Sequence, residues 1–87
     1  MQVIVVYDTA AKRNPKILKL CRRYLHHVQL SVFEGELSAA QFQKFQHEVK
    51  NVIDEDQDHV LIYTAPPAAE LRRISIGTGE AAPTDIL

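Results

Sequence analysis

The sequence predicts an α/β protein: an α+β sandwich of the ferredoxin-like type, with element order βαββαβ and an additional short C-terminal strand. Apolar segments of strand length alternate with two segments whose apolar residues recur at helical spacing. The chain has 87 residues, which is enough for one domain and not for two. We expect both helices on one face of the sheet, a domain over residues 1–79, and a C-terminal tail of little pattern over residues 80–87.

The first strand is a continuous apolar run over 2–7, which predicts a central strand covered on both faces. Asn14 and Pro15 then supply a helix N-cap and a proline at the first helical position. After them, an apolar set and a basic set recur at helical spacing on two different faces. The apolar set is Ile17, Leu20, Cys21, Tyr24 and Val28, and the basic set is Lys12, Lys16, Lys19 and Arg23.

Residues 29–37 are rich in β-forming side chains and predict one bent strand or two short ones, with Gly35 at a bulge or turn. Ser38 and Gln41 have the spacing of a capping box that begins the second helix. Its expected buried face is Phe42, Phe45, Val49, Val52 and Ile53. Another apolar strand follows over 59–64, and the alternation of Ile74 and Ile76 predicts a short edge strand that ends at 77–79.

The net charge of −1 hides a strong asymmetry along the chain. Between Thr9 and Phe33 there are six basic residues and no acidic residue. A basic patch on a nearly neutral protein is typical of a polyanion partner, although a solvated helix face gives the same pattern. The residues that we expect to contact the phosphates of DNA or RNA are Lys12, Arg13, Lys16, Lys19 and Arg23.

Several classes of protein are excluded or disfavoured. The single cysteine, Cys21, permits no internal disulfide. No apolar run approaches membrane-spanning length, and Met1 opens directly into a strand without a signal peptide, so we expect a cytoplasmic protein with no membrane contact. The four histidines lack the spacing of a zinc site, and no nucleophile–base pair for covalent catalysis is evident.

Asp8 is the first candidate for chemistry, because it stands at the carboxyl end of a strand, where open sheets commonly place functional groups. Magnesium takes oxygen ligands, often one or two carboxylates with waters and substrate phosphate. One aspartate per chain makes a poor site, whereas two Asp8 side chains across a two-fold axis would make a plausible one. Such an ion would activate a water and neutralise charge on a phosphodiester. The alternative is that Asp8 accepts backbone hydrogen bonds in the turn after the strand.

Tyr7 and Phe33 are the other candidates, because an aromatic ring stacks well on a base or a ribose. The alternative for both is packing in the core. The motifs Val-Val-Tyr-Asp over 5–8 and Gln-Leu-Ser-Val-Phe-Glu-Gly over 29–35, in this order and spacing, resemble the Cas-two family of CRISPR-associated proteins. This family supplies the small non-integrase subunit of spacer acquisition, also described as a CRISPR-associated endoribonuclease. The resemblance extends from Met1 to about Gly79.

The resemblance implies the ferredoxin-like fold and a homodimer in which the last short strand pairs with the partner's sheet. It aligns Asp8 with the family's metal-binding aspartate, and Tyr7 and Phe33 with positions linked to the active region. Magnesium, with manganese as an alternative, is the implied cofactor. The loop over 9–11 lacks the aspartates that are common there in the family, so no further metal ligands are implied in it.

Three functions remain open from the sequence. The first is a metal-dependent endonuclease that cuts RNA or DNA. The second is a non-catalytic dimeric scaffold that holds duplex DNA and bridges two copies of the CRISPR integrase. The third is a related ribonuclease toxin of the virulence-associated type, which shares the fold, although the segment 31–35 favours the CRISPR-associated family.

Overall fold

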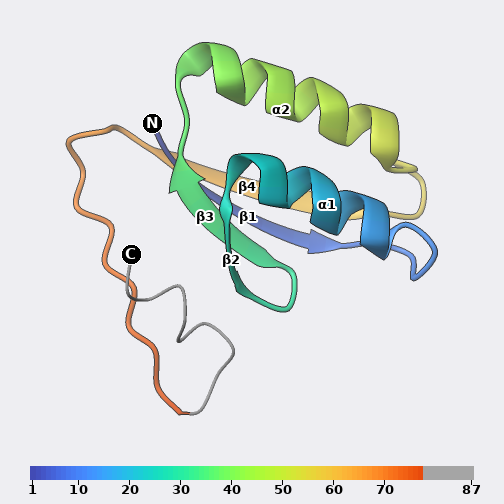
Figure 1. Cartoon of the computed structure of the whole chain (residues 1–87), viewed down its shortest axis with the longest axis horizontal. Coiled ribbons are helices and arrows are strands. Elements are labelled where there is room, and N and C mark those ends of the chain that lie inside the picture. The colour runs from blue at the N-terminus through green and yellow to red at the C-terminus, as the bar shows by residue number, and fades with distance from the viewer. Residues whose placement is uncertain (78–87) are drawn as a thin grey trace.

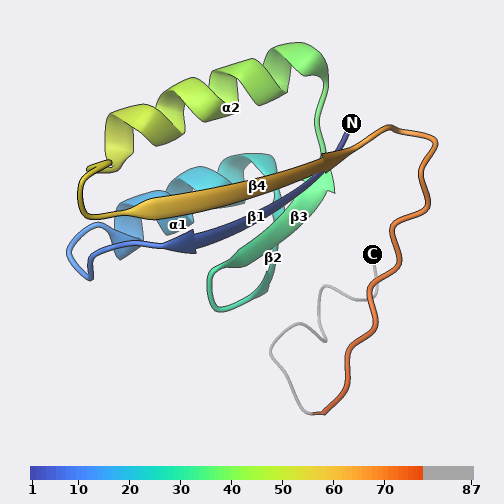
Figure 2. The same ribbon diagram turned by 180° about the vertical axis from the view of Figure 1, so that it is seen from behind.

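A computed structural model describes residues 1–77 and contains a four-stranded antiparallel sheet and two helices in that range (Figure 1). The elements are β1 (Gln2–Asp8), α1 (Asn14–Tyr24), β2 (His26–Gln29), β3 (Val32–Glu36), α2 (Ala39–Val52) and β4 (His59–Ala65). The strand order is β2-β3-β1-β4, and both helices cover the same face of the sheet (Figure 2). The predicted ferredoxin-like order is therefore confirmed. The predicted boundary between residues 1–79 and the tail 80–87 lies outside the described residues.

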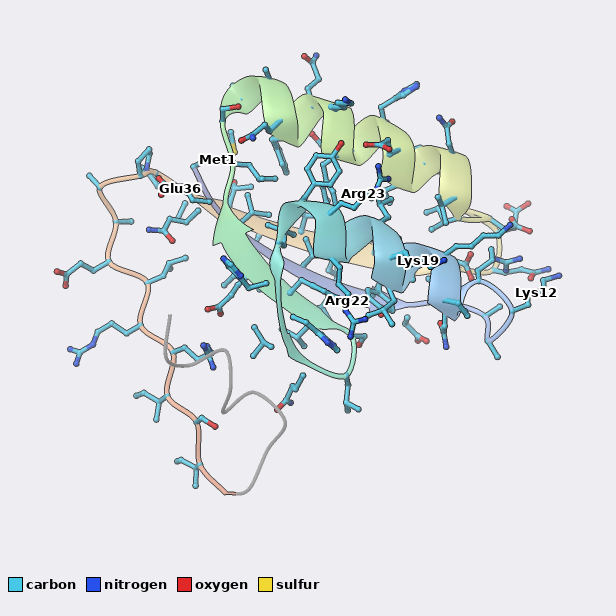
Figure 3. The ribbon with its side chains drawn as sticks, in the orientation of Figure 1. Met1, Lys12, Lys19, Arg22, Arg23 and Glu36 are labelled. Carbon is cyan, nitrogen blue, oxygen red and sulfur yellow. The ribbon has the colours of Figure 1, made fainter. Side chains whose placement is uncertain are left out.

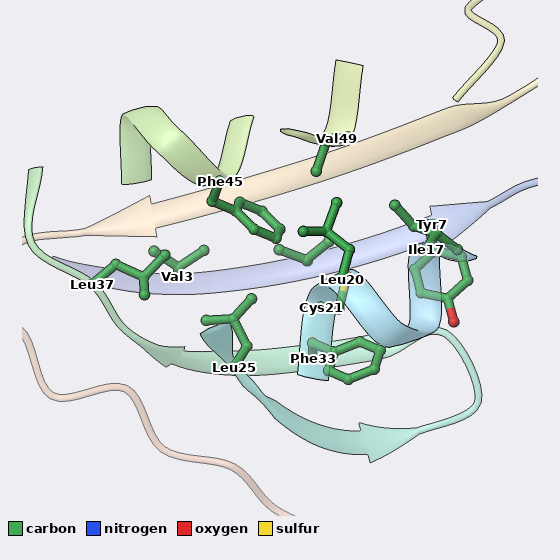
Figure 4. Close-up of a cluster of buried hydrophobic side chains, with 11 residues drawn as sticks. Val3, Tyr7, Ile17, Leu20, Cys21, Leu25, Phe33, Leu37, Phe45 and Val49 are labelled. Atoms are coloured by element: carbon green, nitrogen blue, oxygen red, sulfur yellow. The ribbon is translucent and has the colours of Figure 1, made fainter. Parts of the chain in front are cut away.

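The core lies between the sheet and the two helices (Figure 4). Along β1, side chains alternate: Val3, Val5 and Tyr7 are buried, whereas Ile4 and Val6 are half-buried on the opposite face. The helices add their own buried side chains to this core, which are Ile17, Leu20, Cys21, Phe45 and Val49. The expectation that β1 is covered on both faces is wrong for the single chain. We call the uncovered side, with Ile4, Val6 and Asp8, the helix-free face.

The start and end of α1 differ from the prediction. Arg13, not Asn14, occupies the cap position, and Asn14 is the first helical residue, with its side-chain oxygen accepting a hydrogen bond from the Thr9 hydroxyl. The helix ends at Tyr24, because Leu25 has an extended backbone and the following residues pair with β3. Val28 is therefore buried from β2 and does not belong to the helical apolar stripe.

The β-rich segment forms two short strands, joined at Leu30, which has a positive φ of 39°. Gly35 lies inside β3, so its predicted place at a bulge or turn is wrong; the irregularity falls between His27 and Gln29 in β2. Close packing favours glycine here: a Cβ at position 35 would lie 3.0 Å from Cδ2 of Leu25. The missing side chain lets the buried Leu25 pack closely on β3.

The capping box of α2 is confirmed. The Gln41 amide donates to Oγ of Ser38 at 3.1 Å, and the Ser38 amide donates to Oε1 of Gln41 at 2.9 Å. These two bonds satisfy amides that the first helical turn leaves without partners. Leu37 before the cap is buried, and Phe42 packs against the same core, as expected for a hydrophobic staple.

The expected edge strand over 74–76 does not form within the single chain. Residues 66–77 have no strand, and the Ile74 and Ile76 side chains are 82% and 92% exposed. The segment is held by the Gln2 side chain, which donates to the Ala69 carbonyl at 3.3 Å, and by an ion pair of 3.2 Å between Arg73 and Glu34. A strand needs a neighbouring edge for its backbone groups, and this segment runs past the sheet without joining a ladder (Figure 1).

Candidate functional site

Asp8 is the last residue of β1, and its side chain is exposed. The alternation along the strand places it on the helix-free face, opposite His59 of β4, which is its partner in the β1–β4 ladder and is also exposed. Within residues 1–77, none of the hydrogen bonds or ion pairs involves the Asp8 carboxylate. Its oxygens do not cap the following turn in this structure and are available to a ligand.

Tyr7 and Phe33 lie on the opposite face of the sheet from Asp8. Tyr7 is 8% exposed and Phe33 is fully buried, and their stacked rings are 6.2 Å apart between centroids. The His27 ring stacks on Phe33 at 4.5 Å. Burial raises the pKa of the Tyr7 hydroxyl above its ordinary value. This location favours the core-packing interpretation of both aromatic residues, which hold β1 and β3 in place.

Asp58 connects the two segments that flank Asp8. Its Oδ1 accepts a hydrogen bond of 2.8 Å from the Ala10 amide, and its Oδ2 accepts one of 2.9 Å from the Asp54 amide. Arg13 donates to the same carboxylate from Nε at 2.5 Å and from Nη2 at 3.1 Å. Asp58 is the one charged side chain among residues 1–77 that is buried. The hydrogen bond from Arg13 is the first cause that holds the pKa of this carboxyl well below its usual range.

The predicted phosphate-binding residues fall into two groups (Figure 3). Lys12 lies in the loop before α1, Lys16 and Lys19 lie on the helix, and all three are exposed; we call them the lysine cluster. Arg13 is instead committed to Asp58, with its side chain 13% exposed. Arg23 points toward α2, where its Nη2 lies 2.8 Å from Oε1 of Glu48, although 62% of the side chain is exposed.

The lysine cluster is therefore the part of the basic set that is most open to a polyanion. Arg22 belongs to the same basic run but was absent from the predicted set of phosphate contacts. It is exposed on the side of α1 that faces the β2–β3 hairpin (Figure 3). Its positive charge also acts on the nearby Tyr7 hydroxyl, where it lowers the pKa and opposes the larger effect of burial.

The donor set of the single chain is incomplete for a metal ion. Within residues 1–77, no group of three or more His, Cys, Asp or Glu side chains is arranged to hold one. Asp8 offers a hard carboxylate oxygen of the kind that magnesium and manganese prefer. Asp8 of one chain thus supplies only part of the ligand set of such an ion, and a second copy of Asp8, waters or substrate phosphate would have to supply the rest.

Sequence reasoning missed the roles of Asp58 and His59. Asp58 was one of several acids in the cluster over 54–58, and only the fold shows that it alone is buried. His59 looked isolated, and only the register of β4 brings it beside Asp8. Both relationships join residues about fifty positions apart, a separation at which no local pattern gives a signal.

Fold and site together define a small ferredoxin-like α/β protein with an exposed aspartate at the end of its first strand. The sequence model described as "CRISPR associated protein Cas2" matches residues 1–72. The chain therefore belongs to the Cas2 family of CRISPR-associated proteins. This membership confirms the predicted resemblance and favours it over a virulence-associated toxin.

Similar proteins agree with the family match. The "CRISPR-associated endoribonuclease Cas2" of Frankia alni is 52% identical over 69 residues, which cover 78% of this chain and 79% of that protein. The protein of the same description from Methanosarcina acetivorans is 37% identical over the full length of both chains. A crystal structure of Streptococcus pyogenes Cas2 at pH 6.5 has a TM-score of 0.78 and 32% identity, covering 88% of this chain and all of that one. No helix in the described part of this chain is long and apolar enough to cross a membrane.

Proposed function

We propose that this Cas2 protein is a homodimeric endonuclease that cleaves RNA or DNA with magnesium or manganese bound by Asp8 of both chains. The observation that carries the proposal is the exposed Asp8 carboxylate, which has no partner within residues 1–77 and stands at the end of a central strand. The word "endoribonuclease" in the names of similar proteins supports the RNA-cleaving part of this proposal.

The dimer is proposed to form through the helix-free face. Two cross-strand pairs on this face, Ile4 with Tyr63 and Val6 with Leu61, present apolar side chains. Leu61 and Tyr63 are 42% and 57% exposed. A contiguous apolar face of this kind marks an interaction site more often than a free surface. A second copy would bury it, and the exposed segment 74–76 offers a further strand for pairing with that copy's sheet.

The chemistry follows from the charges that the chain supplies. A divalent ion, when bound, supplies an activated water and neutralises negative charge on the phosphodiester. Asp8 would hold that ion through its carboxylate oxygens. The lysine cluster would bind the flanking phosphates and fix the position of the substrate through electrostatic contacts that carry no base preference.

A second function has separate support in the lysine cluster. Its three exposed ammonium groups can hold duplex DNA without any contribution from Asp8. This is the adaptor role, in which a Cas2 dimer bridges two copies of the CRISPR integrase during spacer insertion. We propose that the adaptor role is the general one and that intrinsic cleavage by this protein is weak or conditional.

The Asp8→Asn variant separates the two functions. Cleavage of RNA or DNA should require magnesium or manganese and should disappear in Asp8→Asn, whereas dimerisation and duplex binding should survive. Spacer integration with the integrase partner should also survive in Asp8→Asn. Cleavage at the normal rate by a nuclease-free preparation of Asp8→Asn would remove Asp8 from the mechanism and with it the proposed activity.

A further inference from the structure

We infer that Asp58 and Arg13 are positioning residues for Asp8: their buried ion pair fixes the two segments that hold the Asp8 carboxylate for a divalent ion. The inference rests on the proposed function of Asp8. It assigns Arg13 a role different from phosphate binding, and it gives the buried Asp58 a role in the chemistry of a site that it does not itself touch.

Asp58 fixes the segment that follows Asp8. The Ala10 amide, two residues beyond Asp8, donates to Oδ1 of Asp58 at 2.8 Å. Arg13, at the cap position of α1, donates twice to the same carboxylate. The loop between β1 and α1 is therefore tied at its middle and at its end. Local bonds from the Arg13 and Asn14 amides to the Ala10 carbonyl also order this loop, and the Asp58 carboxylate ties it to the turn before β4.

The same carboxylate also fixes the strand beside Asp8. Asp58 immediately precedes His59, the ladder partner of Asp8, and it accepts a bond of 2.9 Å from the Asp54 amide in the turn before β4. All four hydrogen bonds converge on one buried side chain. A buried carboxylate with four hydrogen bonds resists movement, because breaking them removes partners from a buried charged group. The backbone on both sides of Asp8 is thus held by one group.

The chain offers a matched control. Glu48 also pairs with an arginine of α1, through a bond of 2.8 Å to Arg23, but it joins α1 to α2 and not to the loop after Asp8. Asp58→Asn and Glu48→Gln each replace one carboxylate by an amide and weaken one ion pair, with Arg13 at the cap position of α1 in the first case and with Arg23 inside α1 in the second. A general effect of lost charge would appear in both variants, whereas a positioning effect would appear only in Asp58→Asn.

The experiment measures binding of Mn²⁺ alone to the full-length protein and hydrogen exchange of the metal-free backbone. In Asp58→Asn, the Ala10 amide should exchange its hydrogen faster, while the amides of β1 and α2 stay protected. Mn²⁺ should bind at least about tenfold more weakly, because removal of a group that orients a metal ligand typically has an effect of this size. Glu48→Gln should change Mn²⁺ affinity by less than about twofold. In the Asp8→Asn background, Asp58→Asn should cause no further loss of Mn²⁺ binding.

Should Asp58→Asn fail to fold by circular dichroism, Arg13→Lys carries the test. It keeps the charge and leaves Asp58 bonded to the two backbone amides, so an intermediate loss of Mn²⁺ affinity is expected. Suppose that a folded Asp58→Asn or Arg13→Lys variant binds Mn²⁺ as tightly as the wild type, while Asp8→Asn binds it weakly. That result would overturn the inference and leave the proposed function intact. Wild-type affinity in Asp8→Asn itself would overturn both, because the ion pair would then have no metal ligand to position.

Discussion

Tyr7 and Asp8 are consecutive residues of β1, yet they point to opposite faces of the sheet. Tyr7 is buried under α1 against Phe33, whereas Asp8 is exposed on the helix-free face. The Tyr-Asp motif therefore joins a residue of the core to a residue of the proposed site. Substitutions on the buried face should therefore change the free energy of unfolding, whereas substitution of Asp8 should change metal binding and cleavage.

Phe33→Ala should destabilise the protein strongly. The Phe33 ring is fully buried between Tyr7 and His27, and removal of such a ring costs about 3–5 kcal/mol of unfolding free energy. Asp8→Asn should change the same quantity by about 0.5 kcal/mol or less, because Asp8 is exposed. Urea denaturation measures both. A small cost for Phe33→Ala would contradict the assignment of this ring to the core.

Nucleic-acid binding should depend on the lysine cluster through its charge. For duplex DNA, the logarithm of the binding constant falls linearly with the logarithm of the salt concentration, and each neutralised phosphate adds about 0.9 to the steepness of that slope. The triple variant Lys12→Ala, Lys16→Ala, Lys19→Ala should flatten that slope by up to about 3 units. The control is Lys44→Ala with Lys50→Ala on α2, which should leave it nearly unchanged. An unchanged slope in the triple variant would place the binding surface elsewhere, and equal effects per charge at the two surfaces would show that binding is not localised to the lysine cluster.

Gly35→Ala should cost about 1 kcal/mol or more of unfolding free energy, because the new Cβ would lie 3.0 Å from Leu25 in a packed region. The cost should shrink when Leu25 is first changed to Ala, since the side chain that the new methyl meets is then absent. A double-mutant cycle in urea measures this coupling. Independent, additive costs would show that Gly35 is required for a reason other than close packing.

The pH dependence of stability should carry the signature of Asp58. Its pKa is lowered in the folded state, so the unfolded state binds more protons once the pH falls toward the ordinary aspartate pKa of about 3.9. The stabilisation is fully present above that range and is lost as pH falls further toward the folded pKa. Asp58→Asn should therefore lose stability less steeply than the wild type between about pH 5 and pH 2. Parallel curves for the two proteins would argue against a strong native-state ion pair.

Local patterns in the sequence predicted the elements of the fold well. The capping box of Ser38 and Gln41, the proline in the first turn of α1 and the apolar run of β1 each depend on neighbours within a few residues. Two of the errors occurred where a local pattern competes with tertiary pairing or packing. Val28 has the spacing of the helical apolar stripe but lies in β2. Gly35 is a residue type typical of a bulge, but it lies in a regular strand in close contact with Leu25.

The candidate site was predictable only in part. Asp8 could be found because a strand end is a local feature, and the structure places it as an exposed carboxylate. The commitment of Arg13 to Asp58 could not be found, because these residues are 45 positions apart and only the folded chain brings the cap of α1 beside the residue before β4. Charge counting along the chain therefore assigned Arg13 to phosphate binding together with its exposed neighbours.

The stoichiometry of Mn²⁺ binding tests most directly the claim that two Asp8 side chains share one ion. Equilibrium dialysis of the dimer, with its mass checked by sedimentation, should give one tightly bound ion for every two chains. Asp8→Asn should remain a dimer and lose that ion. One ion for each chain, or an Asp8→Asn dimer that retains Mn²⁺ with unchanged affinity, would contradict a shared site at Asp8.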